Sequence, residues 1–178
     1  MTTYTIARYD LDIIGIGIAH GFWALEEIQP DGEPKRLAAI HGMATDPQGN
    51  PLPNGQPLDS SDTIKAHIFS ERPPRELGLI PPQDVGQQTT AAAADFLATG
   101  PNAKRRSDLG PMSRAEAVAK FQKALDLARA INAKQAGYVI SGTNSNTVAK
   151  HIGELFGDRS LKEVDGEGHS PTEYNKPG

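Results

Sequence analysis

The stretch "HGFWALEEIQPDGEPKRLAAIHGMA", residues 20–44, contains two apolar runs on either side of a turn. The first run, residues 20–28, mixes aromatic and aliphatic side chains, and the second, residues 36–44, is mainly aliphatic. Between them, "QPDGEPK" contains the Pro, Asp and Gly residues that are typical of turns. Two apolar runs joined in this way predict a β-hairpin.

A histidine stands at each outer end of this hairpin. His20 opens the first strand and His41 closes the second. Because the strands of a hairpin run antiparallel, their outer ends meet, and we expect His20 and His41 to lie close together on one edge of the sheet. A single histidine in such a place is more often structural than functional, but two at matched ends favour a functional interpretation.

The rest of the chain predicts further strands and three helices. An S-x-x-E capping box at Ser113 and Glu116 precedes apolar residues that recur every three or four positions up to residue 134, which predicts an amphipathic helix. A last helix is expected to end at Gly157. The order of elements predicts an α+β fold, with an antiparallel sheet and a packed helical part. The other predicted segments are strands at residues 4–9, 13–18, 63–71 and 138–141 and a short helix at residues 89–99.

The length of 178 residues fits one domain with a core of its own. Apolar residues become sparse after residue 156, so we expect a single domain over residues 1–157 and a flexible tail over residues 158–178.

The composition disfavours several classes of function. The net charge is −4, and the only basic run, "KRR" at residues 104–106, is interpreted as a solvated loop, so nucleic-acid binding is disfavoured. The chain has no cysteine, which excludes disulfides, thiolate metal sites and cysteine nucleophiles. No set of His, Asp and Glu has the spacing of a zinc or calcium site, and no cofactor is expected. The remaining polar strand residues, expected to be solvated, are Asp10, Asp12, Glu26, Glu27 and His67.

The N-terminal sequence "MTTYTIARYDLD" lacks the charged and apolar regions of a signal peptide. The apolar run at residues 13–19 is too short to span a membrane. We therefore expect a protein that is made in the cytoplasm and has no membrane span. Export by a dedicated secretion system that reads no N-terminal signal stays open.

A second region of interest is "SGTNSNT", residues 141–147, where a turn leads into the last helix. Ser145 stands there between Asn144 and Asn146. Either Asn144 or Ser145 could simply cap the helix. Alternatively, Ser145 is a nucleophile, because free N–H groups and the positive end of the helix dipole stabilise an oxyanion. His20 and His41 would complete the set if the helix packs beside the hairpin.

The pattern "HGFWAL", then "RLAAIH", then "NSNT" at the start of a helix resembles the circularly permuted papain-like hydrolases. These include relatives of the NlpC-type cell-wall peptidases and of lecithin:retinol acyltransferase. The resemblance covers residues 13–42 and 138–157. It implies that His20 is the base, that His41 orients it, and that Ser145 occupies the nucleophile position, with Val148 as the apolar residue three positions later. The candidates for holding the oxyanion or positioning the substrate are Asn144, Asn146 and Trp23.

The sequence departs from that family at the nucleophile, where Ser145 stands in place of the usual Cys. A thiol ionises readily beside a histidine, whereas a hydroxyl must lose its proton during the attack. Three interpretations follow: Ser145 is a true nucleophile, the protein has lost catalysis and kept a binding cleft, or serine replaces a native cysteine and traps an inactive enzyme.

The resemblance implies a permuted papain-like hydrolase or acyltransferase that acts on an amide or ester bond. A peptide of the cell wall or a lipid acyl group would be its substrate. Such a domain would suit a bacterial effector, and an immunity protein would then be its partner. The alternatives are a papain-like binding module without catalysis and a structural or phage-type accessory protein.

Overall fold

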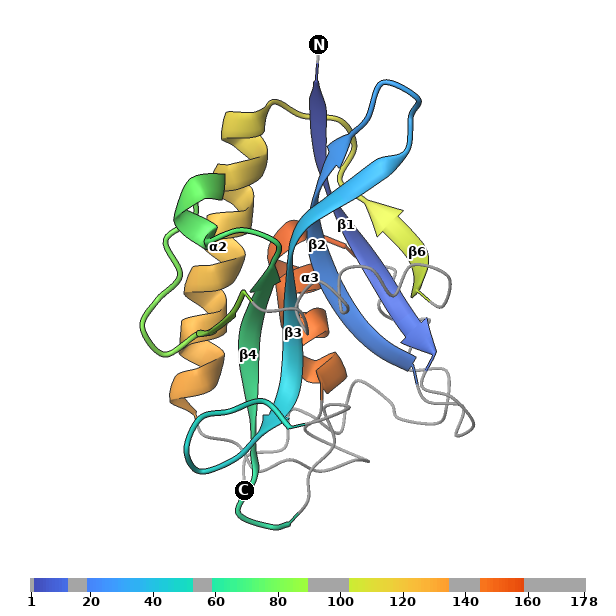
Figure 1. The fold of residues 1–178 in the computed structure, drawn as a ribbon. Coiled ribbons are helices and arrows are strands. Elements are labelled where there is room, and N and C mark those ends of the chain that lie inside the picture. Colours follow the sequence, from blue (N-terminus) through green and yellow to red (C-terminus); the bar gives the residue numbers. More distant parts are fainter. Residues whose placement is uncertain (1, 13–18, 53–58, 90–102, 135–144, 159–178) are drawn as a thin grey trace.

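The computed structural model describes residues 2–12, 19–52, 59–89, 103–134 and 145–158. In these segments, six strands precede two α-helices, and a short 3₁₀ helix lies between the fourth and fifth strands (Figure 1). The elements are β1 (Thr3–Asp12), β2 (Ala19–Ile28), β3 (Pro34–Thr45), β4 (Thr63–Ser70), η2 (Pro74–Leu77), β5 (Gly86–Gln88), β6 (Ala103–Asp108), α2 (Arg114–Ala133) and α3 (Ser145–Phe156).

The strands form one sheet in the order β5-β4-β3-β2-β1-β6. Neighbouring strands are antiparallel except β4 and β5, which run parallel. The α+β class and the mainly antiparallel sheet predicted from the sequence are therefore confirmed. The short parallel strand β5 was not predicted, because its three residues, "GQQ", carry no apolar pattern.

The hairpin predicted at residues 20–44 is formed by β2 and β3. The chain turns at residues 29–33, where the N–H of Gly32 donates to the carbonyl of Gln29 and the backbone of Gly32 is left-handed, with φ of 91°. Phe22 lies opposite His41 in the register. A β-bulge shifts the register between Leu25 and Glu26, so Leu37 is the extra residue on β3.

Both helices cover the same face of the sheet (Figure 1). Side chains of alternate strand residues on this face pack against the apolar sides of α2 and α3. Trp23 and Phe121 are both fully buried there. The main core lies between the sheet and the helices, and its largest members are Ile6, Trp23, Leu25, Ile40, Ile64, Ile68, Leu79, Phe121, Leu125 and Ile152.

The predicted start of α2 and the predicted end of α3 are both confirmed. The N–H of Glu116 donates to Oγ of Ser113, 3.2 Å away, so Ser113 caps α2. Gly157 follows α3 with φ of 74°, a conformation that glycine adopts without strain.

A second, smaller apolar cluster lies on the sheet face that α2 and α3 do not cover. Tyr9 and Phe22 stack there with ring centroids 5.3 Å apart. Strand alternation explains the division, because residues 20, 22, 24 and 26 of β2 point to this face, whereas residues 21, 23 and 25 point toward the helices. The two faces of the sheet are therefore different environments.

Three expectations about polar residues are wrong. The "KRR" run belongs to strand β6 and is not a loop: Arg105 pairs with Glu26 at 3.1 Å and Arg106 pairs with Asp10 at 2.7 Å. Asp10 and Glu26 are therefore not solvated, since each is completely buried against an arginine. The expectation for His67 is also wrong, since its side chain is 1% exposed.

Several predictions lie outside the described residues. These are the strands at residues 13–18 and 138–141, the body of the helix at residues 89–99, and the tail beyond residue 158. Among the helices of the described segments, none is long and apolar enough to cross a membrane.

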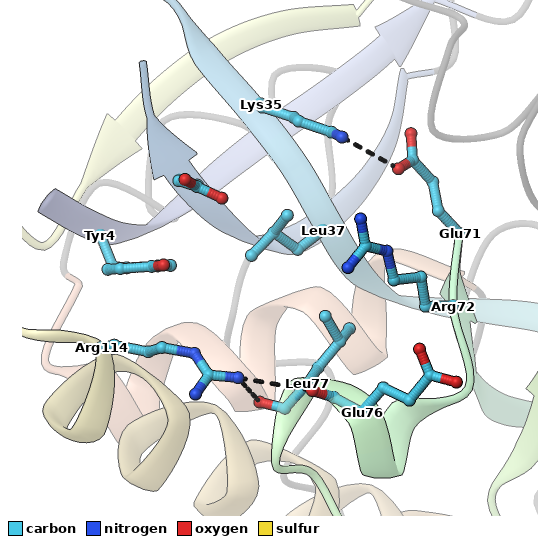
Figure 2. A pocket seen from close by; sticks show the side chains of 9 residues that line it. Tyr4, Lys35, Leu37, Glu71, Arg72, Glu76, Leu77 and Arg114 are labelled. Atoms are coloured by element: carbon cyan, nitrogen blue, oxygen red, sulfur yellow. Dashed lines mark hydrogen bonds and ion pairs between the residues drawn. The ribbon is translucent and has the colours of Figure 1, made fainter. Parts of the chain in front are cut away.

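A small cavity of about 150 Å³ lies where the hairpin end of the sheet meets η2 and the start of α2 (Figure 2). Its lining includes Tyr4, Leu37 and Arg114.

Candidate functional site

The predicted meeting of His20 and His41 is confirmed, but His41 does not close its strand, because β3 continues to Thr45. Nε2 of His20 lies 2.8 Å from Nδ1 of His41, a hydrogen-bonding distance. The two rings stack at an interplanar angle of 11°. His20 is 6% exposed and His41 is completely buried.

The register of β2 and β3 produces this contact. His41 lies opposite Phe22, and His20 precedes Phe22 by two positions on the same face of β2. The imidazole of His20 therefore reaches His41 diagonally across the two strands. Phe22 stacks on His41 with ring centroids 4.2 Å apart, which fixes the plane of the second imidazole.

Burial keeps this histidine pair neutral. It lowers the pKa of His20 to about 4, although the nearby charge of Asp10 opposes the shift. It also lowers the pKa of His41 well below the usual value, and the neighbouring His20 adds to that effect. Within the described residues, Nδ1 of His20 makes no hydrogen bond. The pair thus offers a neutral imidazole with one nitrogen held by His41 and the other available.

The start of α3 is tied to the strand that carries His20. Oδ1 of Asn146 accepts a hydrogen bond from the N–H of Gly21, 2.7 Å away. The helix begins at Ser145, the predicted nucleophile, as the sequence indicated. The side chain of Ser145 and the whole of Asn144 lie outside the described residues. The contact of Asn146 with Gly21 places the first turn of α3 beside the residue that follows His20.

Trp23 anchors the same helix further along. Its Nε1–H donates to the carbonyl of Ala149 at 2.8 Å, and its side chain is completely buried. The indole ring also packs edge-on against Phe156 near the end of α3. In this structure, Trp23 holds α3 against the sheet.

Strand alternation places the histidine pair and α3 on opposite faces of the sheet. His20 shares a face with Phe22, whereas Gly21 and Trp23 face α3. The predicted catalytic set was conditional on the last helix packing beside the hairpin. The helix packs there, but on the face that carries Trp23. A group at the start of α3 reaches His20 only past the end of β2, which begins at Ala19.

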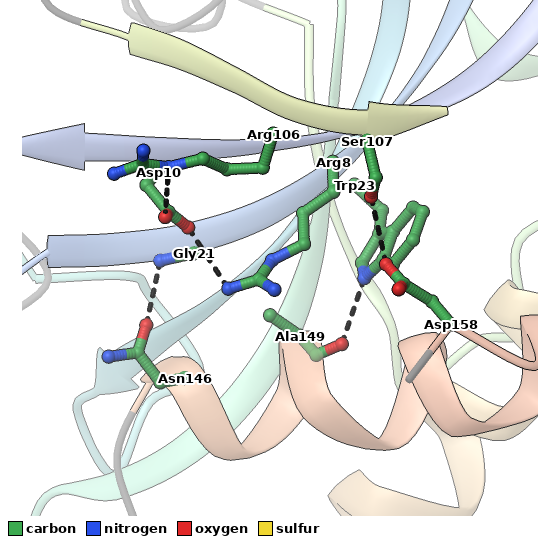
Figure 3. Close-up of polar contacts among 9 residues, drawn as sticks. All are labelled: Arg8, Asp10, Gly21, Trp23, Arg106, Ser107, Asn146, Ala149 and Asp158. Atoms are coloured by element: carbon green, nitrogen blue, oxygen red, sulfur yellow. Dashed lines mark hydrogen bonds and ion pairs between the residues drawn. The ribbon is translucent and has the colours of Figure 1, made fainter. Parts of the chain in front are cut away.

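A buried charge network lies under α3 (Figure 3). The carboxylate of Asp10 forms ion pairs with Nη2 of Arg8 at 3.1 Å and with Nε of Arg106 at 2.7 Å. Arg8 is 2% exposed, and its Nε and Nη1 have no hydrogen-bond partner among the described residues. Two guanidinium groups around one carboxylate leave a net positive charge on the face that α3 covers.

Another network on the face of the histidine pair was missed by the sequence analysis. Glu26 accepts a hydrogen bond from the Tyr9 hydroxyl and pairs with Arg105 at 3.1 Å. The guanidinium of Arg36 lies 5.0 Å from the centroid of the Tyr9 ring. Burial and the hydrogen bond to Glu26 raise the pKa of Tyr9. The bulge at Leu37 brings Arg36 to this face, and no sequence signal marks that bulge.

His67 extends the row of histidines across the sheet. It lies opposite His41 on β4, and its Nε2 is 2.9 Å from Oγ1 of Thr45. Burial lowers its pKa to about 4, and the charge of Lys65 acts in the same direction. Even so, no group of three or more His, Asp or Glu in the described part of the chain is arranged to hold a metal ion.

Comparisons of the chain with protein-family models, with curated proteins and with solved structures gave no match.

Proposed function

We propose that this protein is a permuted papain-like hydrolase or acyltransferase that acts on an amide or ester bond. Ser145 is the nucleophile, His20 the general base and His41 the residue that positions His20. The observation that supports this most is the 2.8 Å contact between Nε2 of His20 and Nδ1 of His41. A base held through one nitrogen by a second polar residue is the arrangement that nucleophilic catalysis needs.

The proposed reaction has two steps. Oγ of Ser145 adds to the carbonyl carbon of the substrate while Nδ1 of His20 takes its proton. His20 then gives that proton to the leaving amine or alcohol as the bond to it breaks, which leaves an acyl-enzyme. Water or an acceptor alcohol, activated by the same nitrogen, releases the acyl group. In both steps, His41 accepts a hydrogen bond from the Nε2–H of His20. This bond holds the proton of neutral His20 on Nε2, so Nδ1 is unprotonated before the attack.

A general base must be unprotonated at the working pH, and a pKa of about 4 leaves His20 neutral near pH 7. The same low pKa makes His20 a weaker base than an imidazole whose pKa lies near 7. The side chain of Asn146 contributes by accepting the N–H of Gly21, which fixes the start of α3 beside the residue that follows His20. The N–H groups of that first turn supply the donors for the oxyanion.

The proposed substrate is a peptide of the cell wall or a lipid acyl group, as the family resemblance implies. We further propose that the protein is a bacterial effector exported by a dedicated secretion system. An immunity protein would inhibit it in the cell that produces it. This part of the proposal depends on the resemblance alone.

A second candidate is a papain-like binding module without catalysis. The observation that favours it is the placement of His20 and α3 on opposite faces of the sheet. A serine that does not reach His20 would act only as a helix cap, and the histidine pair would be a buried structural contact. The third interpretation, a native cysteine replaced by serine, predicts that restoring the thiol creates activity.

The experiment compares the protein with Ser145→Ala, Ser145→Cys and the control Ser61→Ala, an exposed serine in a turn. Release of amines from purified peptidoglycan and of p-nitrophenol from short acyl esters is measured. The hydrolase predicts activity in the protein and in Ser61→Ala and a loss of about 100-fold or more in Ser145→Ala. Activity in Ser145→Cys alone would identify a replaced cysteine, and inactivity of all four would support the binding module.

A further inference from the structure

The cavity of about 150 Å³ lies toward the other end of β3 from the histidine pair. Its nearest lining residue on β3, Leu37, is four positions from His41, a span of about 13 Å at the rise of an extended strand. A cavity of this size holds a ligand of roughly six to nine non-hydrogen atoms. The residues that line the cavity are therefore separate from the proposed catalytic residues, and their role does not depend on the proposed hydrolase.

Three of the nine residues that line the cavity are aliphatic or aromatic. These are Tyr4, Leu37 and Leu77, and all three belong to or pack against the main core. Leu37 is the extra residue of the β-bulge on β3, so the irregularity in the strand supplies this part of the wall. Apolar side chains of this kind favour an aliphatic or small aromatic group.

Two guanidinium groups line the cavity as well. Nη2 of Arg114 donates to the carbonyls of Glu76, at 3.4 Å, and Leu77, at 3.3 Å, which holds this side chain across the end of η2. The guanidinium of Arg72 makes no ion pair or side-chain hydrogen bond with any described residue. Figure 2 shows both guanidinium groups directed toward the space around Leu37 and Leu77. Arginine donors in this arrangement suit a carboxylate.

Carboxylates on the same wall limit the kind of ligand. Glu71 is neutralised by Lys35 at 3.3 Å. Glu27 and Glu76 have no ion pair among the described residues. A simple anion would meet these two negative charges, whereas a molecule that carries an ammonium group as well as a carboxylate matches both sets.

We propose that this cavity binds a small zwitterion of the α-amino-acid type with an apolar side chain. The carboxylate lies between Arg72 and Arg114, the ammonium group faces Glu27 and Glu76, and the side chain rests on Leu37 and Leu77. The site is a recognition site and carries out no reaction.

The test is isothermal titration of the full chain with four probes. L-leucine carries both charges, L-leucinamide lacks the carboxylate, N-acetyl-L-leucine lacks the ammonium group, and glycine lacks the side chain. We expect saturable binding of L-leucine with a dissociation constant on the order of 1 mM, and at least roughly tenfold weaker binding of each of the other three.

The matched variants are Arg72→Gln and Arg75→Gln. Both arginines are exposed and three positions apart, but only Arg72 lines the cavity. Arg72→Gln should weaken L-leucine binding at least about tenfold, and Arg75→Gln should leave it unchanged. Unchanged melting temperatures of both variants exclude a folding defect. The proposal is overturned by the absence of saturable binding, by equal binding of L-leucinamide, or by equal effects of the two substitutions. None of these results depends on whether Ser145 is a nucleophile.

Discussion

Nε2 of His20 and Nδ1 of His41 lie 2.8 Å apart, although 21 positions separate the two residues in the chain. The register of β2 against β3 sets this contact, and the stacked ring of Phe22 supports it. This hydrogen bond between two buried neutral imidazoles has two forms, in which the donor is either Nε2 of His20 or Nδ1 of His41. For a general base, that choice decides whether the free nitrogen can accept a proton at all.

Replacing His41 should reduce catalysis indirectly, because His41 positions His20 and does not contact the substrate. His41→Asn keeps an acceptor for the Nε2–H of His20, whereas His41→Leu removes it. We expect kcat on a p-nitrophenyl ester to fall about 100-fold in His41→Leu and less in His41→Asn, with KM little changed in both. Equal kcat values for the two variants and the unaltered protein would show that His41 has no positioning role.

The buried histidines should make the fold sensitive to acid. The pKa values of His20 and His67 are about 4 in the folded state, against 6.5 for an exposed histidine. The unfolded chain therefore binds more protons between pH 6.5 and pH 4, so stability is complete above pH 6.5 and falls as the pH drops through that window. Each histidine should cost about 3 kcal/mol by pH 4.

Urea unfolding at pH 7.5, 6.0 and 5.0 measures this loss. His67→Gln removes one of the titrating groups and serves as the comparison, because the carboxylates of the chain titrate alike in both proteins. Its free energy of unfolding should decline less steeply from pH 7.5 to pH 5.0. Parallel declines in the two proteins would show that His67 does not contribute to the acid sensitivity.

The hydrogen bond from Trp23 to the carbonyl of Ala149 should matter for stability. Trp23→Phe keeps an aromatic ring in the core but leaves that carbonyl without its donor. We expect a loss of about 1 to 2 kcal/mol, or a fall of about 2 to 8 °C in Tm by calorimetry. A Tm unchanged within error would show that the carbonyl finds another donor.

The contact between Asn146 and Gly21 gives a separate test of how α3 is held. Asn146→Asp retains the oxygen that accepts the N–H of Gly21, and Asn146→Ala does not. Asn146→Ala should lose about 1 kcal/mol of stability, and Asn146→Asp should lose less. A Cβ at residue 21 would lie 3.2 Å from both Oδ1 of Asn146 and Cβ of Ala149, so Gly21→Ala should destabilise the same contact. Chemical denaturation of the three variants gives the ranking, and a stable Gly21→Ala would contradict this tight packing.

The elements that could be predicted are those whose pattern lies within one short stretch of sequence. The hairpin of β2 and β3 has two apolar runs and a turn, and α2 has a capping box, so both could be recognised. The meeting of His20 with His41 followed from antiparallel pairing alone. The opposite faces of His20 and Trp23 also follow from the two-residue period of a strand, a step that the sequence analysis did not take.

The polar partners could not be predicted, because they come from distant strands. Arg105 reaches Glu26 across 79 positions, and Arg106 reaches Asp10 across 96. After Ala103, the edge strand β6 consists of polar residues without alternation, so its sequence resembles a loop. Burial of Asp10 and Glu26 depends on that strand, and without it both look like solvated charges.

The most direct test of the central claim is covalent labelling of Ser145 with a fluorophosphonate. In this reaction, Oγ of Ser145 bonds to phosphorus, fluoride leaves, and His20 takes the hydroxyl proton. Intact-mass analysis and peptide mapping should find one adduct, on Ser145, that is absent from Ser145→Ala and forms at least about 100-fold more slowly in His20→Ala. The absence of an adduct on Ser145, or its formation at the same rate without His20, would contradict the proposed catalytic set.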